Sequence, residues 1–247
     1  MPSRRLPLPA LALAAALLLA AAAAPAQQQG PGFDCAKAST AIEKQICDDW
    51  TLSAYDLWVA QIYKGLREAL DESGRERVKQ EQIAWLKTER NACATAEAQD
   101  GSGDNAPAVW SCLYGVYETR AIQLAQALEA TLYGEDPEGP WSGSYAMNDG
   151  FSDSGIVLLQ MPDGTLSLQL STVSGPTYHV CELTAPGAQR GPDLLQYRDS
   201  EEPGCQITFA RVGDGQGTMK VGSAGCQIYC GARAYFDGTY TAVRPTY

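Results

Sequence analysis

The chain has 247 residues, of which 45% are hydrophobic and 19% are charged, so it is long enough for one large domain or two modest ones. It holds 29 acidic residues against 18 lysines and arginines, which gives a formal net charge of −11. This balance argues against nucleic acid as a partner, because phosphates need a basic surface. The negative charge suits a basic protein partner, which an acidic surface attracts at long range. The commoner explanation of such a charge is that it only keeps the protein soluble.

The first 26 residues predict a secretory signal peptide. Arg4-Arg5 precede a run of Ala and Leu over 6–24, and an A-x-A pattern at 24–26 predicts cleavage before Gln27. The alternative is a transmembrane anchor of about 20 apolar residues, which the cleavage pattern disfavours. No lipidation box precedes Cys35. We therefore expect a soluble periplasmic or secreted protein, with no stable membrane insertion after cleavage.

Eight cysteines in a secreted chain predict disulfides. Four lie on each side of an acidic stretch rich in Pro and Gly at 134–140, which we interpret as a linker. An even number on each side is typical of two separately stapled domains, here 27–133 and 141–247. The expected disulfide residues are Cys35, Cys47, Cys93, Cys112, Cys181, Cys205, Cys226 and Cys230.

Apolar residues in the segment 27–133 recur at a helical spacing and predict an all-α bundle. Ser73-Gly74 is expected to end the second helix, because glycine is a common helix terminator. Pro107, a residue favoured in the first turn, is expected to begin the last. The predicted helices are a short one after Ser39-Thr40, then 52–70, about 75–92, and one from Pro107 onwards.

A series of short motifs spans Phe33 to Leu124, with two pairs of cysteines that frame Trp85. The motifs are Phe33-Asp34-Cys35, Glu43-Lys44-Gln45-Ile46-Cys47, Leu52-Ser53-Ala54-Tyr55-Asp56, Tyr63, Gln82-Ile83-Ala84-Trp85-Leu86, Arg90, Cys93, Cys112-Leu113, Tyr117 and Arg120. Their order and spacing resemble the N-terminal domain of the LprI-type lysozyme inhibitors, bacterial envelope proteins. The resemblance covers somewhat under half of the chain. It implies that the protein protects peptidoglycan by occupying a lysozyme.

The disulfide pairing of the helical half can be narrowed from the sequence. A polar loop over 95–106 joins the last two predicted helices, so Cys93 and Cys112 flank the same corner. We favour a Cys93–Cys112 bridge together with a Cys35–Cys47 bridge, which would pin the N-terminal segment to the first helix. The other two ways of pairing these four cysteines remain open.

Asp56 and Arg120 match positions of the family and could form a functional pair. Residues of this kind more often tie two helices together through a charge-assisted hydrogen bond. Trp58 and Trp85 lie on helical faces and are expected to be core residues. The stretch 100–105 is rich in oxygen ligands but lacks the alternating ligands and terminal Glu of an EF-hand, so we expect a plain loop rather than a Ca²⁺ site.

From Trp141 onwards the apolar period changes to two, which predicts an all-β antiparallel barrel or sandwich. The runs 156–161 and 166–170 are expected to form a hairpin, with an Asp-Gly turn at 163–164. Further strands are expected near 141–146, 177–183, 194–197, 205–211, 218–221, 227–229 and 234–243.

The cysteines and tyrosines of the β half also suggest specific contacts. We favour a Cys181–Cys205 bridge, because both residues lie on predicted strands, and a bridge between Cys226 and Cys230, which are close in sequence. Tyrosines on the strands offer stacking surfaces for a ligand, although strand aromatics are more often packing residues. These are Tyr178, Tyr197, Tyr229, Tyr235 and Tyr240.

The sequence contains no convincing site for chemistry. His179 is the single histidine, and we expect it to be an ordinary surface or packing residue on a strand. Ser142 lies in a G-x-x-S-G sequence without the spacing of a nucleophile elbow, and Asp153-Ser154-Gly155 resembles half of an aspartic-protease loop without a second copy. Zinc spacings, phosphate loops and dinucleotide fingerprints are missing. We predict no catalytic residue, no metal, no cofactor and no enzyme; a carboxylate-based peptidoglycan hydrolase is the weakest alternative.

The leading hypothesis is a lysozyme-inhibitor-like binding protein that protects the bacterial cell wall by occluding a lysozyme. Lysozymes of the host type are basic and cut with two carboxylates in an open cleft, so an acidic, disulfide-rigid protein would be steered to that surface at little ordering cost. The alternative is a non-catalytic envelope module that binds a glycan, a lipid or a protein. The sequence identifies neither the partner-binding residues nor the oligomeric state.

Overall fold

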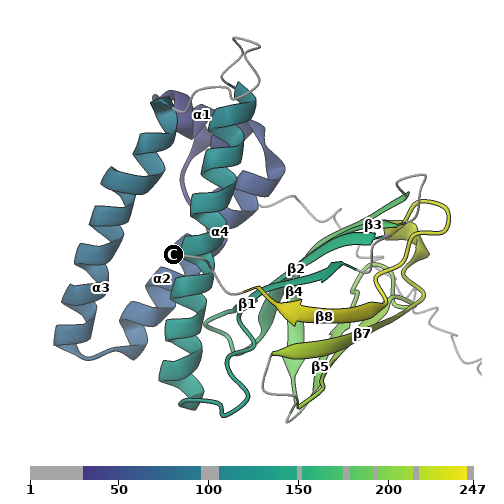
Figure 1. Cartoon of the computed structure of the whole chain (residues 1–247). Coiled ribbons are helices and arrows are strands. Elements are labelled where there is room, and N and C mark those ends of the chain that lie inside the picture. Colours follow the sequence, from purple (N-terminus) through teal and green to yellow (C-terminus); the bar gives the residue numbers. More distant parts are fainter. Residues whose placement is uncertain are drawn as a thin grey trace, which may run out of the picture.

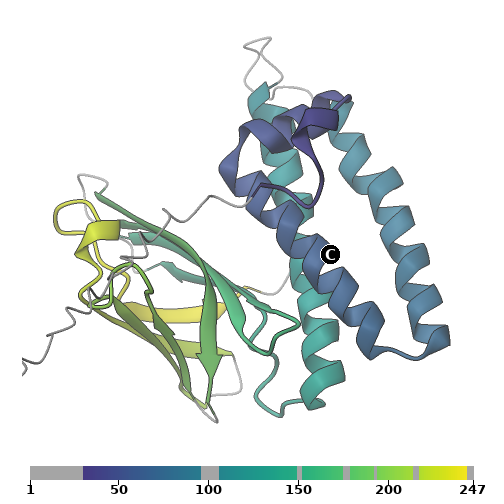
Figure 2. The same cartoon turned by 180° about the vertical axis from the view of Figure 1, so that it is seen from behind.

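The computed structural model consists of a helical region followed by a closed barrel of eight antiparallel strands (Figures 1 and 2). This architecture confirms the predicted all-α and all-β halves and selects the barrel over the sandwich. The predicted signal peptide, the 100–105 stretch and Tyr178 lie outside the described residues. The described residues are 30–95, 106–148, 152–174, 179–191, 194–213 and 217–243.

The first three α-helices begin at Thr40, Asp49 and Asp71, whose side chains accept hydrogen bonds from N–H groups of the first turn. Thr40 and Glu43 form a reciprocal capping box on the first helix, and these backbone hydrogen bonds lower the pKa of Glu43 to about 2. In the described part of the chain, none of the helices has the length and apolar character to cross a membrane. The helical elements are η1 (Cys35–Lys37), α1 (Ala41–Asp48), α2 (Trp50–Ala69), α3 (Glu72–Trp85), η2 (Leu86–Arg90), η3 (Asn91–Thr95) and α4 (Ala106–Tyr133).

The boundary between α2 and α3 differs from the prediction. Ser73-Gly74 lies in the first turn of α3 and does not end α2. The reason is Asp71, whose carboxylate accepts hydrogen bonds from the Gly74 N–H (2.8 Å) and the Ser73 hydroxyl (3.1 Å) and so caps α3. The third helix therefore begins three residues before the predicted Arg75.

The barrel is a meander in which each strand pairs with the next along the chain, and β1 pairs with β8 to close it. The predicted hairpin is β2 and β3, and its turn contains Gly164 with a φ of 87°. One strand prediction is wrong, because 227–229 form a 3-10 turn, η4 (Gln227–Tyr229). The strands are β1 (Gly143–Asn148), β2 (Ser152–Gln160), β3 (Leu166–Ser174), β4 (His179–Arg190), β5 (Leu194–Arg198), β6 (Gln206–Arg211), β7 (Thr218–Ala224) and β8 (Gly238–Ala242).

In the helical half, both favoured disulfides are confirmed: Cys35 pairs with Cys47 and Cys93 with Cys112. Each closes a loop of between 10 and 20 residues, a size for which a bridge typically stabilises a protein by about 3 kcal/mol on the chain-entropy model.

In the β half, both favoured pairings are wrong, because Cys181 pairs with Cys230 and Cys205 with Cys226. The turn η4 brings Cys230 opposite Cys181 in an isolated β-bridge, while Cys226 lies beside the start of β6. The two cysteines that flank this turn therefore bond to different parts of the barrel, Cys181 in β4 and Cys205 just before β6. All eight cysteines are in disulfides, as predicted.

The helical region and the barrel share an apolar boundary. Inward-facing residues of β2 fill the barrel, whereas Val157 and Leu159 on its other side, with Met161 just after it, join the core of the helical region. Gly65 of α2 allows the β2–β3 turn to approach, since a Cβ at this position would lie 2.4 Å from Pro162 Cγ. Figure 1 shows α4 running along the side of the barrel at β1 and β2. The helical core is thus completed by residues of the barrel.

Candidate functional site

Asp56 links the N-terminal segment, α2 and α4. Its carboxylate accepts hydrogen bonds from the Tyr117 hydroxyl (2.7 Å) and from the Gly32 N–H (2.8 Å). Burial raises the pKa of Asp56, an effect that these two donors and the charge of Arg90 oppose. These contacts support a structural role for this family-matched carboxylate.

Arg120 does not pair with Asp56 and instead ties α4 to α3. Its Nε donates to Gln82 Oε1 at 2.9 Å and its Nη1 donates to Gln123 Oε1 at 3.4 Å. The side chain is only 7% exposed, and burial lowers its pKa. The Nη2 atom has no hydrogen-bond partner among the described residues. Asp56 and Arg120 each tie two helices together, as the structural interpretation expects, but they do so through different partners and not through each other.

A groove of about 390 Å³ lies between α2, α3 and α4 on the Arg120 side of the bundle. Apolar side chains of the three helices, among them Leu66, Val78 and Leu124, line it together with the charged Arg77 and Glu81. It is a mixed apolar and charged surface, which makes it a candidate binding site for a ligand that carries both characters.

We expect Tyr117→Phe to destabilise the fold by about 1.5–3 kcal/mol at neutral pH, because a buried carboxylate loses a donor. The pKa of Asp56 should rise further. A folded-state pKa above the unfolded value means that protonation favours the folded state, so the loss should shrink as the pH falls through that pKa. Urea unfolding at neutral and acid pH, with Asp56 titrated by NMR, measures both effects. A loss that does not change with pH would contradict this assignment.

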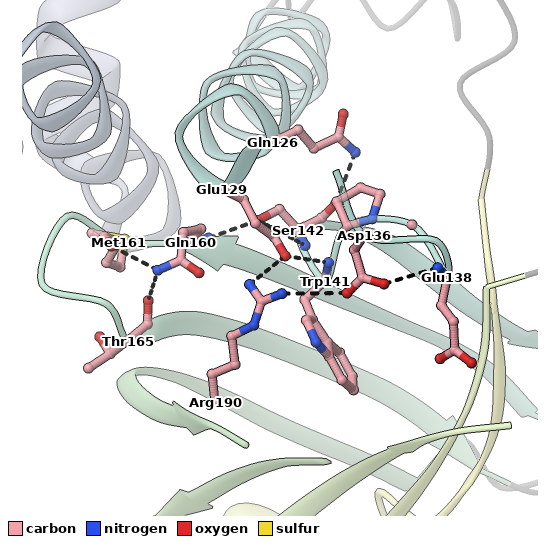
Figure 3. A network of polar contacts seen from close by, with 12 residues as sticks. Gln126, Glu129, Asp136, Glu138, Trp141, Ser142, Gln160, Met161, Thr165 and Arg190 are labelled. Carbon is pink, nitrogen blue, oxygen red and sulfur yellow. Dashed lines mark hydrogen bonds and ion pairs between the residues drawn. The ribbon is translucent and has the colours of Figure 1, made fainter. Parts of the chain in front are cut away.

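A second polar cluster joins the end of α4 to the barrel (Figure 3). Glu129 of α4 is 3% exposed and accepts hydrogen bonds from the backbone N–H groups of Trp141 and Ser142, both at 2.9 Å. The Ser142 hydroxyl donates to the same carboxylate at 2.8 Å, as does the guanidinium of Arg190 on β4. Four donors therefore compensate for the burial of one charge.

Two arginines of the barrel hold the acidic stretch that follows α4. Arg211 Nη1 lies 2.8 Å from Asp136 Oδ2, and Arg190 Nη2 lies 3.5 Å from it. The Arg211 guanidinium also stacks 4.1 Å from the ring centroid of Trp141, and that of Arg190 lies 4.4 Å from the ring centroid of Tyr133. The predicted linker is thus fastened to the barrel by ion pairs, and the aromatic residues on either side of it by cation–π contacts.

The structure assigns packing roles to most of the other residues singled out in the sequence. Trp58 and Trp85 are buried in the helical core, as predicted. Ser142 belongs to the cluster around Glu129, and His179 begins β4 opposite Ser174 of β3. Asp153 lies on β2. Tyr197 and Tyr240 are buried, Tyr229 is half-buried, and Tyr235 is exposed.

The cluster around Glu129 was not predicted. Its signal in the sequence is a glutamate that directly follows Leu128, the last residue of the apolar stripe of α4. Within the described ranges, no group of three or more His, Cys, Asp or Glu side chains is placed to hold a metal ion.

Four disulfides are typical of proteins of an oxidising, extracytoplasmic compartment. Residues 35–124 match the model of a family described as "Lysozyme inhibitor LprI". Over these residues the helical segment is therefore similar to the LprI lysozyme inhibitors, as its motifs predict. The match ends within α4 and leaves the barrel unassigned. Comparisons with curated proteins and with solved structures gave no significant match.

Proposed function

We propose that this protein is a periplasmic or secreted inhibitor that binds a lysozyme and blocks its access to the cell wall. The match of residues 35–124 to the lysozyme-inhibitor family carries this proposal. The signal-like sequence of residues 1–26 and the disulfides support export and a mature chain that begins at Gln27. In this proposal 27–133 and 141–247 are two structural domains, joined through 134–140.

The physical basis of inhibition would be occlusion rather than chemistry. A rigid surface that covers an open, carboxylate-lined cleft excludes the polysaccharide without any covalent step. Four disulfides and a buried polar joint keep the chain rigid, so little conformational freedom is lost on binding. The formal charge of −11 supports fast encounter with a basic enzyme. We therefore propose no catalytic residue and no cofactor.

The association rate constant with a basic lysozyme is expected to fall at least about tenfold between roughly 50 and 500 mM salt, because screening shortens the reach of the acidic surface. Stopped-flow or surface-binding kinetics with the oxidised full chain measures this rate. The full chain is needed because Val157, Leu159 and Met161 of the barrel complete the helical core. A rate that is independent of salt would remove electrostatic steering from the proposal.

The groove beside Arg120 supports a second candidate, a non-catalytic envelope module that binds an anionic glycan fragment. Arg120 would supply a cation at the base of the groove, while the half-buried Leu70 would contact the sugar rings. Titration with a soluble muramyl peptide, followed by NMR shifts of the groove residues, tests this function. Shifts at the groove combined with failure to inhibit any lysozyme would favour it over the inhibitor.

A further inference from the structure

The connection between β7 and β8, residues 225–237, covers the end of the barrel that faces away from the helices. Both views show this yellow segment on the far side of the barrel from α2, α3 and α4 (Figures 1 and 2). It contains η4 and lies outside the residues that match the inhibitor family. This surface is therefore separate from the helical domain.

Two disulfides fix the segment at both ends of η4. Cys226 is bonded to Cys205 and Cys230 to Cys181, so the five-residue stretch Cys226–Cys230 is attached to two different strands or strand ends. The Gly231 N–H donates to the Val180 carbonyl at 2.8 Å. A segment held in this way retains one conformation without help from a partner.

The fixed segment presents apolar side chains to solvent. Ile228 is 64% exposed, the highest value of any large hydrophobic residue in the described ranges, and Tyr235 is 46% exposed. Val180, whose carbonyl binds the segment, is 39% exposed. Isolated exposed apolar residues are ordinary, but several around one disulfide-fixed turn are typical of an interaction surface.

The backbone of the segment includes an unfavourable conformation. Arg233 has a φ of 71° and is the single described residue other than glycine with a positive φ. Left-handed backbone is costly for a residue with a Cβ and persists only where its surroundings enforce it. Such conformations cluster at binding sites, because the energy of the rest of the fold maintains a shape that suits the partner.

Exposed acidic side chains lie in and near the segment. Glu201 and Glu202 are exposed and raise the pKa of Tyr229 through their charges, after the larger effects of burial and its hydrogen bond to Asp199. Glu182 and Asp237 are also exposed near the two anchoring strands. Two exposed arginines, Arg198 and Arg233, lie in the same part of the barrel, so acidic groups outnumber basic ones.

We propose that the 225–237 segment, with Ile228 and Tyr235 at its centre, is a docking surface for a basic lysozyme. The proposal rests on the function proposed above and adds a contact made by the barrel. The apolar centre would be buried against the enzyme, and the acidic rim would face its positive surface. Because this surface and the helical domain lie on different parts of the molecule, the barrel would extend the footprint of the inhibitor.

The test compares Ile228→Ser/Tyr235→Ser with a matched control, Val212→Ser/Leu132→Ser, in the oxidised full chain. Val212 and Leu132 are 45% and 42% exposed but lie outside the segment. Inhibition constants are measured against a panel of basic lysozymes, one from each structural class. We expect the docking variant to inhibit about 10- to 100-fold more weakly, as loss of a central anchor does, and the control to match the wild type. Circular dichroism and thermal unfolding verify that both variants fold.

Three outcomes are distinguishable. Selective weakening of the Ile228→Ser/Tyr235→Ser variant supports the docking surface. Equal inhibition by all three proteins overturns it and leaves inhibition with the helical domain. A wild-type chain that inhibits no lysozyme overturns the proposed function and the docking surface together. As a second readout, Glu201→Gln/Glu202→Gln should slow association at low salt but not at high salt, and an unchanged rate would remove the acidic rim from the proposal.

Discussion

Replacing Glu129 by alanine is expected to destabilise the protein by about 3–5 kcal/mol, the usual result of breaking a buried ion pair. The substitution leaves the Arg190 guanidinium, 17% exposed, without the carboxylate that lies 2.8 Å away. It also removes the acceptor for the N–H groups of Trp141 and Ser142 and for the Ser142 hydroxyl. Each buried donor left without a partner adds its desolvation penalty.

Unfolding in guanidinium chloride at neutral pH measures this loss of stability, and Glu138→Ala is the matched control. Glu138 is 47% exposed and lies 3.8 Å from Arg211, so its removal should cost no more than about 1 kcal/mol. Glu129→Gln should fall between the two, because an amide keeps an acceptor oxygen but not the charge. Similar losses for Glu129→Ala and Glu138→Ala would show that the Glu129 cluster does not hold the helices to the barrel.

Two glycine-to-alanine substitutions in helices should have opposite effects. At Gly65 the new Cβ would lie 2.4 Å from Pro162 Cγ and 2.6 Å from its Cβ, so α2 or the β2–β3 turn must shift. The expected cost is about 1–3 kcal/mol, as for other overpacked sites. At Gly115 of α4 a Cβ meets nothing within 4 Å, so the gain in helix propensity should stabilise the protein by up to about 1 kcal/mol.

Thermal and denaturant unfolding of the two variants side by side separates packing from propensity. If Gly65→Ala stabilised the chain as much as Gly115→Ala, the close approach of α2 to the β2–β3 turn would be wrong. A Gly65→Ala variant that unfolds in two separate transitions would show that this contact couples the helices to the barrel.

Local signals explain how much of the fold could be predicted from the sequence. The helical half was predictable because its apolar stripe and its capping residues are encoded within a few residues of each other, as in the Thr40–Glu43 box. The β2–β3 hairpin was predictable for the same reason, since its Asp-Gly turn lies between two apolar runs. The start of α3 was misplaced because Asp71, one of several polar residues between the two helices, is its N-cap.

The features that the sequence left open, such as barrel against sandwich, or that were predicted wrongly depend on residues far apart in the chain. Closure of the barrel needs β1 to pair with β8, through Tyr145 with Ala242 and Ala146 with Thr241, nearly a hundred positions away. The β-half disulfides depend on how η4 turns, which the short Cys226–Cys230 spacing does not reveal. One signal was present and not used: the run 156–161 is apolar without strict alternation, which is typical of a strand buried on both faces.

The joint between the halves could not be derived from the acidic stretch alone. Asp136 finds its partners in Arg190 and Arg211, which come from β4 and β6. Composition correctly marks the stretch as a boundary between helices and strands. It does not reveal that ion pairs attach this boundary to the barrel. Both arginines come several strands later in the sequence, in β4 and β6.

The most direct test of the proposed function is the residual activity of a basic lysozyme on a cell-wall suspension, measured against increasing amounts of the oxidised chain from Gln27 onward. The reduced and alkylated chain serves as the control, because the disulfides hold both halves. We predict that activity falls in proportion to added inhibitor and is abolished near equimolar amounts, while the reduced chain has little effect. Full lysozyme activity at a large molar excess of folded chain, for every lysozyme class, would contradict the proposed function.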